Sequence, residues 1–207
     1  LLGLLLRENR IKLSARLLAT SVQNFSIHLI PIVLTSATLD TASVGKFLLA
    51  LAIVTMPSLV FGKYLNDLFY VRFSKSPIQA QDALFKLILF YLTLLVIYQF
   101  FGRVVDIDNA FEFLGQKWFG IGVYVQALGY LAFAQLITNP ILQYYYQSGF
   151  FLANVFNLIR LGVTLFWCML IFNECIDLVQ FGFGYSICLL CMAFSLAIYH
   201  VWSLKWR

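Results

Sequence analysis

The stretch from Trp118 to Ile159 reads WFGIGVYVQALGYLAFAQLITNPILQYYYQSGFFLANVFNLI and contains 42 consecutive residues without a formal charge. One crossing of a bilayer by an α-helix takes about 20 apolar residues, so this stretch is twice as long as one crossing needs. The Gln-Ser-Gly sequence at 147–149 is its strongest turn signal. The sequence therefore predicts two membrane helices, over 118–146 and 150–172, joined by a tight hairpin.

The composition of the whole chain leads to the same class of protein. Of its 207 residues, 62% are hydrophobic and 11% are charged, whereas soluble domains have roughly 45–50% apolar and about 25% charged residues. A water-soluble globule is thereby excluded, and the apolar residues suffice for roughly six crossings. We expect an all-α, polytopic membrane protein.

Four further apolar runs complete the expected topology. They lie at about 17–37, 44–64, 83–102 and 178–204. The segment between the second and third of the six spans, 66–81, carries too many charges to sit in lipid. We therefore expect residues 1–207 to form a single six-helix membrane bundle.

Basic residues collect on one side of the expected membrane. Ten of the fourteen lysines and arginines flank one set of span ends and three flank the other, while most acidic residues fall on the second side. By the positive-inside rule, both termini are expected in the cytoplasm. The same bias accounts for the net charge of +5 without a nucleic-acid partner.

The motifs of membrane enzymes are missing from the sequence. The chain has no HExxH, no Gly-x-Ser-x-Gly and no Walker lysine loop. Its two histidines lie far apart, so neither a metal site nor a cofactor is expected, and its four cysteines are expected to be buried and inert. Asp106 and Asp108 have the Asp-x-Asp form of metal-dependent sugar transferases, but they fall on the expected outer loop, away from cytoplasmic nucleotide sugars. No enzymatic activity is expected.

Arg160 is the one formal charge well inside an expected span. Arginine near a helix centre costs on the order of 2.5–3.5 kcal/mol on insertion scales, so its default place is a bundle interior or a water-filled cavity. Asn154 and Asn157 precede it at three-residue steps and extend it into a polar stripe. Guanidinium binds phosphate through paired N–H donors, so this stripe could hold an anion. Alternatively, Arg160 caps the carbonyls of a neighbouring helix or snorkels to the nearer interface.

Amide side chains repeat at four-residue steps along the preceding span, at Gln135, Asn139, Gln143 and Gln147. They could hold helices together through hydrogen bonds, or they could line a path for a hydroxyl-rich substrate.

The first expected span offers Asn24 and His28, four residues apart. His28 could be a hydrogen-bonded packing residue or a proton relay. Pro31, Pro57 and Pro140 lie inside expected spans, where each bends its helix. Bent helices around a polar interior are typical of a transporter, although no Asp or Glu lies in mid-span to couple transport to an ion.

Four segments, in this order, carry a resemblance to a known family: Ser26 to Pro31; Val44 to Ala52 followed by Met56-Pro57; Leu65 to Lys75; and Leu114 to Trp118 with Tyr124 and Asn139-Pro140. The chain resembles the C-terminal half of the polysaccharide (O-antigen type) flippases of the MOP superfamily, relatives of the MATE drug exporters. Lys117 stands where an acidic residue is more usual in that family.

The resemblance implies a twelve-helix transporter that turns lipid-pyrophosphate-linked oligosaccharide from the inner to the outer leaflet, for surface polysaccharides such as the O-antigen of lipopolysaccharide. The expected partners are membrane lipid, the lipid-linked oligosaccharide, and either a missing N-terminal six-helix half, with Leu1 at the junction, or a second copy. Arg160 is expected to attract the pyrophosphate. The remaining substrate-binding candidates are Asn154, Asn157, Asn139, Gln143, Gln135, Asn24 and His28.

Two other functions remain open at this point. An integral-membrane polysaccharide polymerase or ligase would need catalytic groups on the outer face, where the candidates are Asp106, Asp108, Glu112, Glu174 and Asp177. A multidrug exporter on the same scaffold would favour an acidic or aromatic cavity over a basic one lined with amides.

Overall fold

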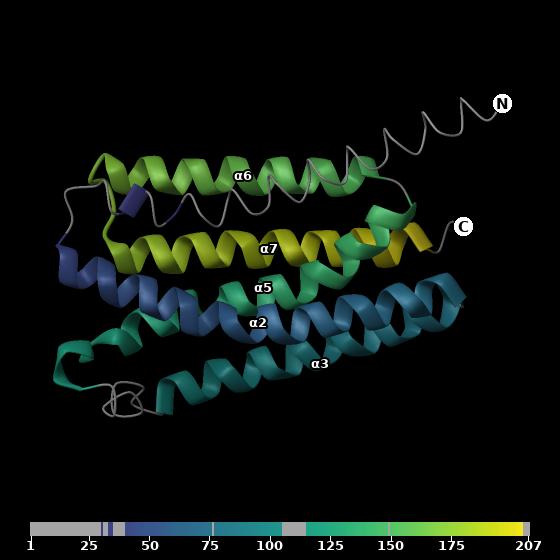
Figure 1. Cartoon of the computed structure of the whole chain (residues 1–207), viewed down its shortest axis with the longest axis horizontal. Helices are drawn as coiled ribbons and strands as arrows, with labels where there is room; N and C mark the ends of the chain where they lie inside the picture. Colours follow the sequence, from purple (N-terminus) through teal and green to yellow (C-terminus); the bar gives the residue numbers. More distant parts are fainter. Residues whose placement is uncertain are drawn as a thin grey trace.

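A computed structural model of the chain is all-helical in the part that it describes (Figure 1), which comprises residues 30, 33–34, 40–75, 77–104, 115–148 and 150–204. It contains five long helices and one short 3-10 turn: α2 (Thr41–Lys75), α3 (Pro77–Val104), η2 (Gln116–Trp118), α5 (Ile121–Ser148), α6 (Phe150–Phe172) and α7 (Leu178–Leu204).

Each of the five helices contains a segment long and apolar enough to cross a bilayer: Thr41–Gly62, Asp82–Phe100, Ile121–Tyr146, Phe151–Phe172 and Leu178–Ser203. The chain is therefore a multi-pass helical membrane protein. The described residues hold five such helices rather than the six expected, because the span predicted at 17–37 lies almost wholly outside them. The other five predicted spans each fall on one of these helices.

The charged connection expected at 66–81 is itself helical. Helix α2 continues to Lys75 and α3 begins at Pro77, so Ser76 alone separates them. Hydropathy marks the part of a helix that lipid surrounds, whereas backbone hydrogen bonds continue into the aqueous layer. Proline suits the first position of α3 because the backbone N–H that it lacks would have no partner within the helix there. An Asp82–Lys86 ion pair of 2.7 Å, one turn apart, then supports the polar part of α3.

The sequence predicts a helix that begins at Trp118. In the structure, α5 begins three residues later, at Ile121. Gly115 and Gly120 flank η2 with φ angles of +93° and +85°, a backbone conformation that favours glycine. The Lys46 ammonium donates a hydrogen bond of 2.7 Å to the carbonyl oxygen of Phe119, which ties this turn to the start of α2.

Aspartates cap two of the helices at their first turns. The Asp40 carboxylate accepts bonds of 2.9 Å from both the backbone N–H and the hydroxyl of Ser43, and these bonds, the backbone one first, lower the pKa of Asp40. Asp177 and Gln180 form a reciprocal capping box at the start of α7.

The helices alternate in direction across the bundle (Figure 1). The starts of α2, α5 and α7 lie with the ends of α3 and α6, at the left of Figure 1; we call this the Thr41 end, and the opposite one the Lys75 end. Helix α5 runs through the middle and packs most extensively against α2 and α7, while α3 and α6 lie at opposite edges.

The core at the Thr41 end is centred on Phe47, which is fully buried. Its ring makes edge-to-face contacts with Tyr124 and Phe181, at centroid distances of 5.9 and 5.7 Å. Gly182 permits the close approach, since a Cβ there would lie 3.2 Å from the Phe47 ring and 3.3 Å from Ala127. Small residues at such contacts are typical of helix packing in membranes.

We predict that Phe47→Ala lowers the free energy of unfolding by at least about 1 kcal/mol. The usual cost of ~3–5 kcal/mol for Phe→Ala includes transfer from water, which is small in lipid, but the lost dispersion contacts of the cavity remain. Equilibrium unfolding of the purified chain in detergent micelles measures this. The control is Phe151→Ala, where the side chain is 80% exposed and no loss is expected. Equal effects of the two substitutions would contradict the described core.

Candidate functional site

Arg160 faces the interior of the bundle. It lies about ten residues from the start of α6 and twelve from its end, near the middle of the ~30 Å hydrocarbon layer. Only 4% of its surface is exposed. Its Nε is buried without a hydrogen-bond partner, and in the part of the chain that the structure describes the guanidinium forms no ion pair. A buried charge without protein partners is a costly feature that calls for a functional explanation.

Two amides extend this feature along α6. Asn157, 1% exposed, donates from Nδ2 to the Tyr146 hydroxyl at 2.7 Å, which fixes the orientation of its side chain. The Oδ1 atoms of Asn157 and Asn154 are buried without hydrogen-bond partners. The site thus offers an unused N–H donor on Arg160 together with two unused carbonyl acceptors, so it can bind an anionic group and a hydroxyl group side by side.

Thr164 continues the stripe toward the Thr41 end. Its hydroxyl donates to the carbonyl oxygen of Arg160 at 2.9 Å and lies 3.3 Å from the Tyr185 hydroxyl of α7. We call Asn154, Asn157, Arg160 and Thr164 the α6 stripe. Tyr146 of α5 and Tyr185 of α7 contact it on two sides, through Asn157 and Thr164.

A histidine that sequence analysis did not place in any site lies near the Lys75 end. His200 of α7 is 1% exposed, its Nδ1 is 3.3 Å from the Tyr145 hydroxyl, and its ring contacts Tyr144 and Tyr145 edge-on at 4.8 and 5.5 Å. The run of three tyrosines at 144–146 therefore meets His200 and, through Tyr146, Asn157. A histidine in the last span and three tyrosines in a row were signals available in the sequence.

The amides of α5 lie elsewhere. Gln135 is buried and accepts a short hydrogen bond from the Ser58 hydroxyl of α2. Asn139 also faces α2, because a Cβ at Gly62 would lie 3.1 Å from its Nδ2. Neither forms a hydrogen bond with the α6 stripe among the described contacts. Gln135 therefore matches the interhelical role, and Asn139 packs toward α2.

The remaining candidates divide by position. Gln143 is half-buried in α5, whereas Asn24, His28, Asp106, Asp108 and Glu112 lie outside the described residues. Glu174 and Asp177 are exposed in the α6–α7 connection. No group of three metal-ligating side chains occurs among the residues that were described.

All four cysteines are free, and the expectation that they are buried holds for Cys168 but is wrong for Cys175 and Cys191, which are exposed. Cys175 follows the end of α6 in the polar connection, and Cys191 lies on an exposed face of α7, in a groove shared with α6. Apolar neighbours in the sequence located the cysteines on membrane helices but could not tell which helix face they occupy.

Comparison of the chain with protein-family models, curated proteins and solved structures finds no match. A functional assignment therefore depends on the chemistry of the α6 stripe and its surroundings.

We predict that Arg160→Met raises the free energy of unfolding by about 1–3 kcal/mol, because it replaces a buried charge that forms no ion pair with the described residues by an apolar side chain of similar length. Equilibrium unfolding in micelles again provides the measurement. The neighbouring Thr164→Val serves as the comparison and should lower stability, since it removes the bonds to Arg160 and Tyr185. A loss of stability in Arg160→Met would show that the arginine holds helices together.

Proposed function

We propose that this protein is a membrane transporter that moves lipid-pyrophosphate-linked oligosaccharide from the inner to the outer leaflet for surface polysaccharide biosynthesis. The observation that carries the proposal is Arg160, buried near the middle of the membrane with its Nε unpaired and with no ion pair to any described residue. The protein forms a bundle of a MATE-like transporter and works as a carrier, not as an enzyme.

The two parts of this substrate match the two kinds of unused groups in the α6 stripe. The guanidinium of Arg160 donates hydrogen bonds to pyrophosphate oxygens, an interaction that strengthens where water is scarce. The Oδ1 atoms of Asn154 and Asn157, which lack partners, accept hydrogen bonds from sugar hydroxyls. The substrate thereby satisfies groups that the folded chain leaves unsatisfied.

The sign of the interior charge separates this function from drug export. A cationic drug would meet repulsion from Arg160, the buried cation of the α6 stripe, whereas an anionic lipid is attracted. A polymerase or ligase would need catalytic groups near the outer face; of the acidic candidates that the structure describes, Asp177 caps α7 and Glu174 is exposed.

The proposal includes an orientation and a topology. The Lys75 end faces the cytoplasm of the inner (plasma) membrane, because the basic flanks of the chain predict it by the positive-inside rule. Residues 17–37 add a sixth span, which leaves both termini in the cytoplasm, and a second bundle faces this one across the transport path. The prolines inside α2 and α5, Pro57 and Pro140, permit the bending that alternating access requires.

We predict that Arg160→Ala abolishes surface polysaccharide while the protein still inserts in the membrane at its normal level. Loss of a charged hydrogen bond is expected to weaken pyrophosphate binding at least about tenfold, and polysaccharide export is lost for this reason. Surface polysaccharide is quantified by labelling whole cells, and insertion by the amount of protein in washed membranes.

Two variants make this test specific. Lys86→Ala removes the same charge from an exposed position and should leave polysaccharide unchanged. Arg160→Lys keeps the charge but loses the two-pronged geometry, so an intermediate level is expected. Normal polysaccharide in Arg160→Ala would remove Arg160 from the mechanism and the proposal with it.

A further inference from the structure

A large apolar cavity lies on the side of α5 away from the α6 stripe. It has a volume of about 610 Å³ between α2, α3 and α5, and its walls include Pro57, Phe61, Leu94, Gly129 and Phe133. It opens on the membrane-facing surface, since Phe61 in its wall is 61% exposed. Surfaces of this composition at membrane depth are in contact with hydrocarbon.

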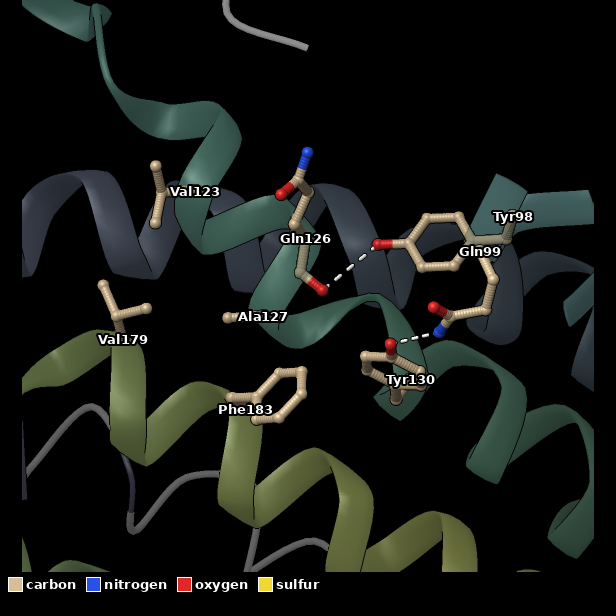
Figure 2. Close-up of a pocket in the computed structure, with 8 residues that line it drawn as sticks. All are labelled: Tyr98, Gln99, Val123, Gln126, Ala127, Tyr130, Val179 and Phe183. Atoms are coloured by element: carbon tan, nitrogen blue, oxygen red, sulfur yellow. Dashed lines mark hydrogen bonds between the residues drawn. The ribbon is translucent and has the colours of Figure 1, made fainter. Parts of the chain in front are cut away.

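A smaller cavity of different chemistry lies at the Thr41 end, between α3, α5 and α7 (Figure 2). Its volume is about 230 Å³, and Figure 2 shows Gln99, Gln126 and Tyr130 around it, with Phe183 of α7 on the far side. The Gln99 amide donates to the Tyr130 hydroxyl. No charged side chain lines this cavity in the described structure. Its polar groups are amides and phenols, which both donate and accept hydrogen bonds, as hydroxyl groups do.

Tyr98 is a wall of both cavities. Its hydroxyl donates to the carbonyl oxygens of Val125 and Gln126, at 3.3 and 3.2 Å. Its ring lies in a notch at Gly129, where a Cβ would be only 1.9 Å from the Tyr98 hydroxyl oxygen. The polar cavity and the apolar cavity therefore adjoin at a side chain that the fold holds in place.

The depth of the two cavities matches the layers of a bilayer. Along α3 the apolar cavity extends from Leu87 to Tyr98, about 16 Å at the rise of an α-helix, a little more than half of the ~30 Å hydrocarbon layer. The polar cavity lies where the apolar segment of α3 ends, at Phe100, which is headgroup depth.

We propose that the two cavities form one binding site for a membrane glycolipid, with a hydrocarbon chain in the apolar cavity and an uncharged sugar headgroup against Gln99, Gln126 and Tyr130. Among the described side chains no cation lines the smaller cavity, which disfavours a phosphate headgroup, whose charge would be desolvated without a partner. Helices α3 and α6 lie at opposite edges of the bundle (Figure 1), so this site is separate from the α6 stripe and does not depend on the proposed transport.

Photolabelling tests the site directly. The full chain is reconstituted in phosphatidylcholine vesicles with monoglucosyl diacylglycerol that carries a photoreactive group on one acyl chain, and the labelled peptides are mapped. Labelling is expected on α3 and α5 at the apolar cavity. Excess unlabelled monoglucosyl diacylglycerol should suppress it, whereas phosphatidylglycerol should not. Labelling spread evenly over all exposed helix faces, or equal competition by phosphatidylglycerol, would overturn the proposal.

Two variants examine the two halves of the site. Ala132→Leu fills the apolar cavity and should reduce labelling at least fivefold, while Ala52→Leu, the same change on an exposed face of α2, should leave it unchanged. Gln126→Ala alters an exposed side chain without a packing defect and should weaken glycolipid labelling about threefold, as expected for one lost hydrogen bond. Unchanged labelling in Gln126→Ala would exclude headgroup recognition at this cavity, and unchanged labelling in Ala132→Leu would exclude the chain site.

Discussion

The burial of one guanidinium group in the middle of a membrane bundle is the constraint on which the described site depends. Burial removes Arg160 from water, and its Nε has no hydrogen-bond partner in the described structure. Helix α6 must therefore turn this side inward, and the Asn157–Tyr146 and Thr164–Tyr185 contacts hold it against the neighbouring helices. Packing in the rest of the bundle offsets the free-energy cost of burying this guanidinium in the ligand-free protein. A ligand of opposite charge would remove that cost.

Helix α5 separates the polar groups of the bundle into two kinds. On the side toward α2, Gln135 bonds to Ser58, and this pairing contributes to packing. Near the Lys75 end, Tyr146 instead orients Asn157 and leaves the Oδ1 of that amide unused. Polar groups that satisfy each other stabilise the fold, whereas groups left unsatisfied are available to a substrate. In the α6 stripe, the Oδ1 atoms of Asn154 and Asn157 and the Nε of Arg160 are unsatisfied, and the proposed transport would use them.

The sequence predicts the membrane helices well because their signal is local. The hairpin at 147–149 is confirmed, with α5 ending at Ser148 and α6 beginning at Phe150. Helix ends are predicted less well, since hydropathy does not record where backbone hydrogen bonds stop, as the continuation of α2 to Lys75 shows. The charge of Arg160 favours an inward position, but snorkelling to the interface stays open until the structure shows the residue to be 4% exposed. The sequence does not show which helix packs against Gln135, because a four-residue spacing defines a helix face but not the neighbour that covers it.

The proposed transport requires that Arg160 binds an anionic lipid rather than holding helices together, and the effect of such a lipid on thermal stability distinguishes the two roles. The most direct measurement is the thermal unfolding of the purified protein with and without a long-chain prenyl pyrophosphate, in wild type and in Arg160→Met. At a hundredfold excess over the wild-type Kd, the ligand should raise the Tm of the wild type by roughly 5 °C or more, and it should raise that of Arg160→Met by no more than about half as much, because the variant binds at least about tenfold more weakly. Equal shifts in both proteins, or no shift in the wild type, would contradict the account.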